Sequence, residues 1–117
     1  MSLDSVLLVG AGNHARLDEG TIVMHGAVIN AGVVVGKNFI INSQSVIEHD
    51  VVIADHCHLS AAATINGGVQ IGLGTFIGSG DNIRQEIKIG ERCLIGMGQN
   101  VLSDCEPGQC IPSKRLS

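Results

Sequence analysis

The hydrophobic positions of this chain recur every six residues. A helix repeats at 3.6 residues and a simple strand at 2, so neither element explains this period. It extends backwards to Leu17, and Pro107 ends it. Such a period indicates an architecture of stacked repeat units. The aliphatic residues of the repeat are Val23, Ile29, Val35, Ile41, Ile47, Ile53, Leu59, Ile65, Ile71, Ile77, Ile83, Ile89, Ile95 and Val101.

The residues between these aliphatic positions follow the same period. Glycine or asparagine often comes directly after the aliphatic residue, as at Asn30 and Gly72, and both types tolerate a left-handed backbone, so we expect a corner there. The fourth residue after it is usually small, as at Ala27 and Ala63. Two inward side chains and one corner make one side of a triangular prism. Three sides make a coil of about 18 residues, and stacked coils pair as parallel strands about 4.8 Å apart. The pattern predicts an all-β parallel β-helix of hexapeptide repeats with about five coils.

Composition narrows the class of protein further. Aromatic residues make up only 2% of the chain, Phe39 and Phe76 being the whole set, so the interior must be narrow and aliphatic. A net charge of −4 with seven Lys and Arg gives no basic surface for nucleic acid. No apolar run approaches the roughly 20 residues that span a bilayer, and the first residues lack the features of a signal peptide. We expect a soluble cytoplasmic protein with no nucleic-acid or membrane partner.

The four cysteines show no metal-type or redox spacing, which favours a reducing cytoplasm. Cys57 and Cys93 both fall in the small inward position, two coils apart. Their expected separation of about 9–10 Å excludes a disulfide, so we interpret them as core residues. Cys105 and Cys110 lie beyond the regular repeat, and we interpret them as free thiols.

The repeat is interrupted at Glu48-His49-Asp50, three ionisable residues at one corner. A histidine followed directly by a carboxylate can be oriented and made more basic by it, as a general base requires. A solvated surface corner is the alternative interpretation. One coil further on, Gly67 stacks on His49, and its backbone N–H could stabilise an oxyanion. A structural corner glycine explains Gly67 equally well.

Two further columns of the stack contain small residues. Together they predict a shallow stripe along one edge of the prism, where an extended pantetheine arm could lie against bare backbone. Close packing of the coils would also require small residues there. The columns are Ser60, Gly78 and Gly96, and Ala62, Gly80 and Gly98.

The stretch from Ile47 to Ser60, IEHDVVIADHCHLS, resembles the sugar acetyltransferase branch (NeuD/PglD type) of the hexapeptide-repeat acyltransferase family. The resemblance implies a left-handed β-helix. It also implies that His49 deprotonates the acceptor, that Asp50 assists it, and that the amide of Gly67 faces the thioester oxygen. The acetyl donor is then acetyl-CoA, with no metal and no covalent enzyme intermediate.

The same resemblance implies where acetyl-CoA and the partner subunits lie. His58 helps bind the donor, and the family's CoA contacts correspond to Gly78, Ser79, Gly96 and Met97. Family members are homotrimers with the active site between neighbouring prisms. The sequence adds its own reason for a homotrimer, because His49 and His58 are half a coil apart and must lie on different sides of one prism.

Both ends of the chain depart from the family pattern. Residues 6–15 resemble the first strand and glycine loop of the family's nucleotide-sugar domain, which implies Gly12, Asn13 and His14 as substrate-binding residues. The repeat follows at once, so residues 1–16 are either a remnant of that domain or an irregular first coil. Residues 17–106 form the β-helix domain, and residues 107–117 form a tail with a shortened final coil. The last residues resemble the family's closing segment.

Three functional hypotheses follow from these residues. The first is an acetyl-CoA-dependent acetyltransferase acting on an amine or hydroxyl of a small-molecule sugar or nucleotide-sugar acceptor. The second is a zinc enzyme of the γ-carbonic-anhydrase type, suggested by His49, His56 and His58, although their spacing differs from that family's ligands. The third is a non-catalytic trimeric scaffold, suggested by the missing sugar domain.

Overall fold

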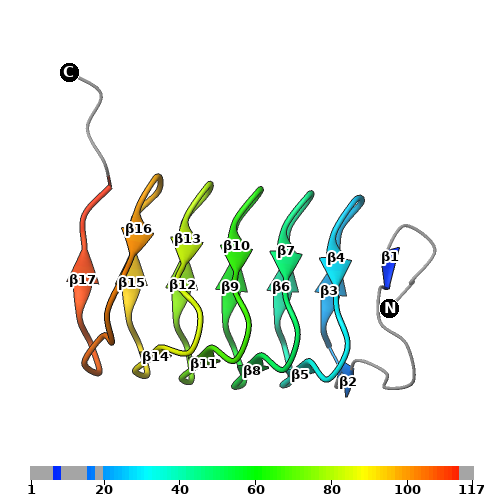
Figure 1. Cartoon of the computed structure of the whole chain (residues 1–117), viewed down its shortest axis with the longest axis horizontal. Coiled ribbons are helices and arrows are strands. Elements are labelled where there is room, and N and C mark those ends of the chain that lie inside the picture. Colours follow the sequence, from blue (N-terminus) through cyan, green and yellow to red (C-terminus); the bar gives the residue numbers. More distant parts are fainter. Residues whose placement is uncertain (1–6, 9–15, 18–19, 114–117) are drawn as a thin grey trace.

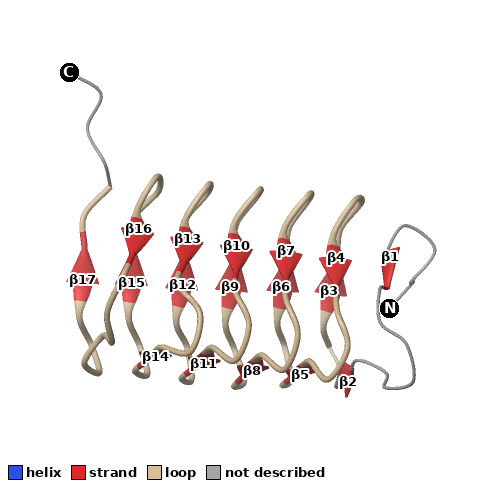
Figure 2. Ribbon diagram, in the orientation of Figure 1, coloured by secondary structure: helices blue, strands red, loops and turns tan. Residues whose placement is uncertain are grey.

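Short parallel strands stacked along one axis build the whole of the described fold. The computed structural model describes residues 7–8, 16–17 and 20–113, the first two segments as backbone only. This part of the chain contains no helix, and its strands are each two residues long and joined by tight corners (Figure 2). Successive coils of the chain lie next to one another along the long axis of the molecule (Figure 1).

The strands form three parallel sheets, one for each side of the prism. Sheet A contains β1 (Leu7–Leu8), β4 (Val28–Ile29), β7 (Val46–Ile47), β10 (Thr64–Ile65), β13 (Asn82–Ile83) and β16 (Asn100–Val101). Sheet B contains β2 (Arg16–Leu17), β5 (Val34–Val35), β8 (Val52–Ile53), β11 (Gln70–Ile71) and β14 (Lys88–Ile89). Sheet C contains β3 (Ile22–Val23), β6 (Ile40–Ile41), β9 (His58–Leu59), β12 (Phe76–Ile77), β15 (Leu94–Ile95) and β17 (Cys110–Ile111).

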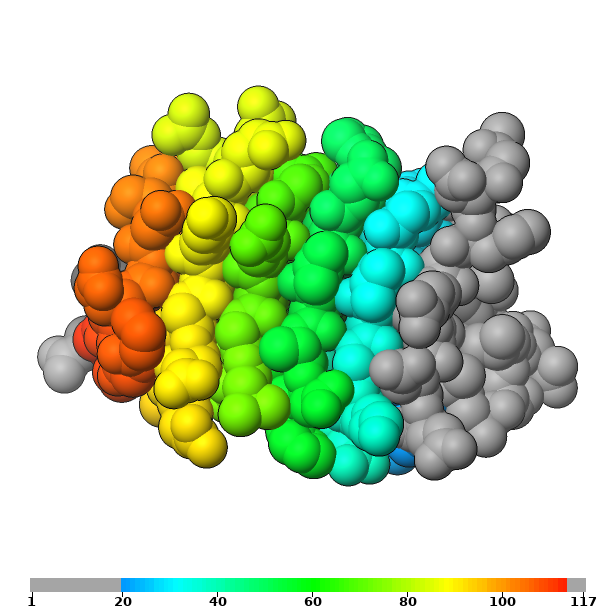
Figure 3. Space-filling model, turned by 90° about the horizontal axis from the view of Figure 1, so that it is seen from below, coloured from blue at the N-terminus to red at the C-terminus, as the bar shows by residue number. Residues whose placement is uncertain are grey.

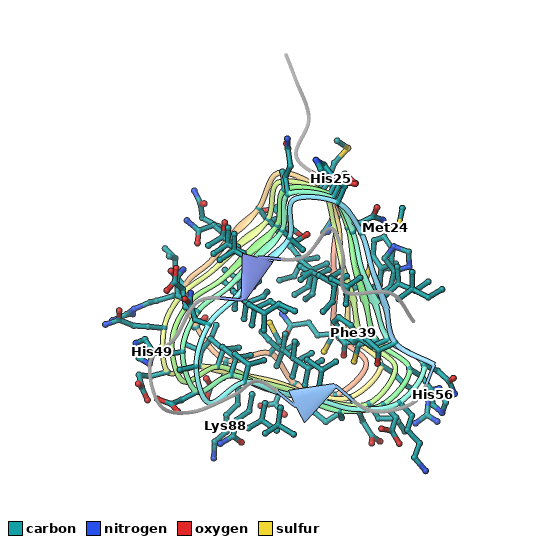
Figure 4. All side chains as sticks on the ribbon, turned by 90° about the vertical axis from the view of Figure 1, so that its right-hand side faces the viewer. Met24, His25, Phe39, His49, His56 and Lys88 are labelled. Atoms are coloured by element: carbon teal, nitrogen blue, oxygen red, sulfur yellow. The ribbon has the colours of Figure 1, made fainter. Side chains whose placement is uncertain are left out.

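The strand register confirms the predicted parallel β-helix of about five coils. Ile47 pairs with Ile65, and Ile65 with Ile83, so each coil advances the chain by one 18-residue turn. Seen from the N-terminal end, the corners that carry His25, His49 and His56 follow one another counter-clockwise as the chain recedes (Figure 4). This sense is left-handed, as the resemblance implied.

The interior of the prism is the predicted aliphatic core. Every aliphatic residue of the six-residue period from Val23 to Val101 is buried, and Phe39 lies inside the triangle with them (Figure 4). Cys57 and Cys93 are buried and unpaired, as predicted. On the face of sheet B the coils pack against one another as continuous bands (Figure 3). Burying a side chain such as isoleucine stabilises a fold by about 1.5–3 kcal/mol. The buried aliphatic residues of the period are therefore the main source of the hydrophobic stabilisation of this fold.

The left-handed backbone lies elsewhere than predicted. It falls on the third residue after each aliphatic position from Leu17 to Ile95, as at Asp50 and Gly80, and the residue directly after the aliphatic position does not adopt it. Gly78 is a glycine for another reason, because a Cβ atom there would lie 2.6 Å from the backbone nitrogen of Met97 in the next coil. The glycines that follow the aliphatic residues therefore allow close stacking of the coils.

The regular spacing changes at both ends of the solenoid. Leu7 pairs with Val28, a longer step than the standard coil. Cys110 pairs with Leu94 and Cys105 bridges Ile89, so the last coil is two residues shorter than the others. The domain boundaries at residues 16 and 106 stay predictions. In the described part of the chain, no helix has the length and apolarity that crossing a membrane requires.

Candidate functional site

The corner between β7 and β8 holds His49 and Asp50 on a fixed backbone. Asp50 adopts the left-handed conformation (φ 59°), and its N–H donates to the carbonyl of Ala31 in the preceding coil at 3.0 Å. The carbonyl of His49 accepts from the N–H of Gly68 in the next coil at 3.0 Å. The two side chains nevertheless stay 64% and 74% exposed in the single chain. The corner therefore presents both groups to solvent on a rigid support.

His49 contacts both of the residues that the sequence placed beside it. Its Nδ1 lies 3.2 Å from Oδ2 of Asp50. On the other edge of the ring, a Cβ atom at Gly67 would lie 2.6 Å from both Nε2 and Cε1, so only glycine leaves room for the imidazole. The Gly67 N–H makes no hydrogen bond among the described residues. The arrangement places a free backbone donor beside the unpaired edge of the imidazole.

Glu48, the third ionisable residue of this corner, does not join the pair. Its carboxylate accepts a hydrogen bond from Asn30 Nδ2 at 3.2 Å in the preceding coil. It therefore lies along the stack, away from His49.

His58 lies on a different side of the prism from His49. It sits on β9 in sheet C, and its ring packs against that of Phe76 with centroids 5.0 Å apart. His49 belongs to the corner between sheets A and B, so one chain does not bring the two histidines together. The predicted separation within one prism is found, and the trimer that would unite them stays a prediction.

A hollow of about 330 Å³ lies over the corner between sheets C and A, at the C-terminal end of the solenoid. Glycines leave its floor as bare backbone, while Leu94 and Met97, which are 50% and 55% exposed, form apolar edges. It contains the four residues predicted to contact CoA along the chain. Its lining is Ser60, Phe76, Gly78, Ser79, Leu94, Gly96, Met97, Cys110, Ile111, Pro112 and Ser113.

The second column of small residues does not line this hollow. Ala62, Gly80 and Gly98 are the left-handed corner residues, and a Cβ atom at Gly80 would meet nothing within 4 Å. Glycine suits this backbone conformation, but Gln44 adopts it in the same column, so the conformation alone does not require small residues.

Three features near these sites were not predicted to be site residues. Pro112 and Ser113 close one wall of the hollow because the shortened last coil turns back over it. Asp81 is fully buried, although the other residues of its inward column are small, and that contrast was visible in the sequence. A polar hollow of about 430 Å³ beside Gly67 is lined by Asn66, Asn82, Arg84, Gln85, Asn100 and Leu102.

The remaining predicted site residues are placed as follows. Gly12, Asn13 and His14 lie outside the described residues. His56 occupies the corner between sheets B and C, where its Nδ1 lies 3.4 Å from Asn38 Nδ2, and it points away from His49 (Figure 4). Within the described ranges, no three His, Cys, Asp or Glu side chains gather as a metal site. Burial raises the pKa of the Cys57 thiol, so it does not supply a ready thiolate.

Comparisons with known proteins agree with this fold. No protein-family model and no curated protein sequence matches the chain. Among solved structures, a mutant of perosamine N-acetyltransferase from Caulobacter crescentus, in complex with CoA and GDP-perosamine, is 28% identical with a TM-score of 0.73. The match covers 89% of this chain and 53% of that one.

Two more solved structures are similar to the chain. The acetyltransferase domain of PglB from Neisseria gonorrhoeae, in complex with acetyl coenzyme A, is 27% identical with a TM-score of 0.64, over 96% of this chain and 58% of that one. WeeI from Acinetobacter baumannii, at 23% identity and a TM-score of 0.74, covers 92% of this chain and 51% of its own, and shows the shared fold. The chain thus spans between half and three fifths of each of these three structures. It is a hexapeptide-repeat β-solenoid of the type found in sugar N-acetyltransferases.

Proposed function

We propose that this chain catalyses acetyl transfer from acetyl-CoA to an amine or hydroxyl of a nucleotide-activated sugar. One observation carries the proposal: the imidazole of His49 packs against Gly67, where no side chain fits, while its other nitrogen contacts Asp50. The likeness to acetyltransferases that bind CoA, acetyl-CoA and a nucleotide sugar supports the choice of substrates.

His49 is the general base of the proposed reaction. When the ring proton is on Nδ1, the Nδ1–H donates a hydrogen bond to Asp50, and Nε2 keeps its lone pair. Nε2 takes the proton of the acceptor as its nitrogen or oxygen attacks the thioester carbon. The protonated ring then supplies a proton to the departing CoA sulfur when the C–S bond breaks. The products are the acetylated sugar and CoA thiol, and no enzyme side chain is acylated.

Gly67 is the proposed oxyanion donor. During the attack the thioester oxygen gains negative charge, which a pre-positioned backbone N–H stabilises. The Gly67 N–H is not used by another acceptor in the described part of the chain and lies beside the His49 ring. Base and oxyanion donor therefore face the same reacting carbon.

The hollow over Gly78, Ser79, Gly96 and Met97 is the proposed site of the pantetheine arm. A bare backbone floor with exposed Leu94 at its edge suits a narrow chain of alternating amide and methylene groups. We propose that His58 helps position the donor from sheet C. Residues Gly12, Asn13 and His14 remain our proposal for contacts with the acceptor.

The active form is proposed to be a homotrimer with shared sites. The hollow and His49 lie on different corners of the prism, so the reacting groups meet only when the hollow of one subunit faces His49 of its neighbour. A threefold ring satisfies this requirement for all three subunits at once. The free thiols found in the described chain fit a protein that works in the reducing cytoplasm.

Subunit complementation tests the shared site. His49→Ala subunits keep an intact hollow, and Ser79→Phe subunits keep an intact base. Each is expected to have little activity alone at a subsaturating acetyl-CoA concentration. A co-expressed equal mixture should recover about a quarter of the parent activity, because about three quarters of the rings are mixed and each mixed ring has one of its three sites complete. No recovery from a mixture shown by mass to contain both subunits would place the whole site within one chain.

Titration calorimetry with acetyl-CoA separates catalysis from the scaffold alternative. We expect saturable binding with one donor per subunit and a screen of amino-sugar nucleotides that identifies an acceptor. A scaffold would leave acetyl-CoA unbound.

A further inference from the structure

Asp81 is an ionisable group in the interior of a β-helix whose core is otherwise aliphatic or weakly polar. Its side chain is 0% exposed. The equivalent inward positions in the three preceding coils carry Ala27, Ser45 and Ala63. Packing at this position therefore requires only a small residue. A buried carboxylate costs stability unless its hydrogen bonds are satisfied, so its presence requires an explanation.

The carboxylate closes the corner that forms the floor of the hollow. Its Oδ2 accepts a hydrogen bond from the N–H of Gly78 at 2.7 Å, and the N–H of Asp81 donates to the carbonyl of Gly78 at 3.2 Å. In a preceding coil the N–H of Ala63 donates to the carbonyl of Ser60 at 3.4 Å, without any carboxylate. The equivalent turn in the earlier coil thus forms without a carboxylate. At Asp81 the carboxylate adds a second hydrogen bond across the turn.

The second carboxylate oxygen reaches the next coil. Oδ1 of Asp81 accepts from the N–H of Gln99 at 2.8 Å. The side chain of Gln99 then donates from Nε2 to the carbonyl of Pro112 at 2.6 Å. Pro112 and the adjacent Ser113 form one wall of the hollow. Asp81 is therefore linked to both the floor and the closing wall.

We propose that Asp81 is a positioning residue for the donor-binding hollow, which it aligns through Gly78, Gln99 and Pro112. Its role in donor binding rests on the function proposed above. The alignment of the closing segment is a property of the free protein and does not depend on that function.

The ionisation of Asp81 provides a signature of this role. Burial raises the pKa of its carboxyl from 3.8 to about 6, although the N–H groups of Gln99 and Gly78 favour the charged form. The adjacent strands β9, β10, β12, β13, β15 and β16 carry one titratable side chain, His58, which lies on the outer surface against Phe76. Protonation occupies one acceptor oxygen, so the carboxyl gives up either its bond from the Gln99 N–H or its bond from the Gly78 N–H, which also donates to the carbonyl of Ile95 at 2.9 Å.

Stability and donor binding should therefore respond to pH in opposite directions. The folded state takes up the proton at higher pH than the unfolded chain, so the Asp81 contribution to stability rises as pH falls from above 6 towards 4. Donor affinity should fall over the same range because the corner and the closing wall loosen. A residue with only a structural role would move both quantities together.

The test uses Asp81→Asn, which mimics the protonated carboxyl, and Asp81→Ala, which restores the residue type found at Ala63. Thr75→Val is the matched control, because Thr75 is also buried and also accepts an N–H from the residue one coil on, Cys93, at another corner. Hydrogen exchange of residues 109–113 in the free protein and acetyl-CoA affinity between pH 5 and 7.5 are measured for all four proteins.

Both Asp81 variants should exchange faster than the parent at residues 109–113 and bind acetyl-CoA about five- to tenfold more weakly at pH 7.5. Relative to Asp81→Ala, the parent should gain melting temperature and lose donor affinity as pH falls through 6. Thr75→Val should match the parent in exchange and affinity. Unchanged exchange in both Asp81 variants would overturn the proposal even if the parent binds no acetyl-CoA, an outcome that would refute the donor function alone.

Discussion

Two corners of the same prism present different surfaces to solvent. The corner at His49 projects ionisable side chains into solvent, whereas the corner at Gly78 and Gly96 has lost its side chains and forms a hollow. Both begin from the same hexapeptide, in which an inward aliphatic residue is followed by a tight turn. The residues between the aliphatic positions differ, with Glu48-His49-Asp50 at one corner and Gly78-Ser79-Gly80 at the other.

Under the proposed function, this difference divides the site between the two corners. One corner supplies reactive groups by adding side chains, and the other supplies space by removing them. Because the two lie on different corners, neither is a complete site by itself. The predictions below separate the two corners by their effects on turnover and on donor binding.

Replacement of the base should have the largest effect. A positioned general base contributes about 10²–10⁴-fold to rate, so His49→Ala should lower kcat by that factor with acetyl-CoA affinity nearly unchanged. His56→Ala is the control, since His56 is an exposed histidine on another corner. Steady-state kinetics with the accepted sugar and calorimetry with acetyl-CoA provide the two readouts. Equal losses of kcat in both variants would remove His49 from the mechanism.

Gly67→Ala should have the next largest effect, through the position of the His49 ring. The added Cβ would lie 2.6 Å from Nε2, and because the ring is exposed it can swing away without disturbing the coil. A displacement of about 1 Å in a catalytic group can cost about 10²-fold in rate. We expect such a loss of kcat with an unchanged melting temperature.

A double-mutant cycle provides the check on Gly67. In a His49→Ala background the same Gly67→Ala change should have little further effect, because the displaced group is already absent. Additive losses would show that Gly67 acts independently of the ring.

The hollow can be filled from Ser79 with a smaller effect. Ser79→Phe should weaken acetyl-CoA binding about tenfold or more, equivalent to at least ~1.4 kcal/mol, with the fold intact. Ser43→Phe is the matched control, because Ser43 occupies the same corner column two coils earlier, outside the hollow. Gly78→Val is unsuitable, since its Cβ would strike the backbone of the next coil. Equal affinities of the two serine variants would move the donor away from this corner.

The sequence predicted the architecture well because the period of six directly reports the stacking. The 18-residue coil length assigns each inward isoleucine or valine to a position in the stack. Counting residues along the chain therefore predicted both the core and the contact between His49 and Gly67. The left-handed corner residue was misplaced because a glycine can serve either backbone conformation or close approach. Composition does not separate these two causes.

Asp81 and the closing wall show the other limit of sequence reasoning. Asp81 occupies an inward position of the six-residue period that usually holds a small residue, and this position was treated as small throughout. The charge of Asp81 distinguished it from the other residues at this position. The sequence predicted a shortened final coil, but only the strand pairing places the two-residue shortening between Val101 and Cys105, so Pro112 and Ser113 could not be assigned to the hollow. Deviations from a repeat are therefore as informative as the repeat itself.

Asp50→Asn should have the smallest effect and thereby refine the role of the exposed corner. The carboxylate lies 3.2 Å from His49 Nδ1, and an exposed pair of this kind contributes about 0.2–1 kcal/mol. The expected loss of kcat is thus roughly fivefold or less, with asparagine accepted readily in the left-handed conformation that Asp50 adopts. Asp55→Asn at the next corner is the control for a change of net charge. A loss as large as that of His49→Ala would mean that Asp50 is screened from solvent in the assembled site, where the interaction of its charge with the imidazolium is much stronger.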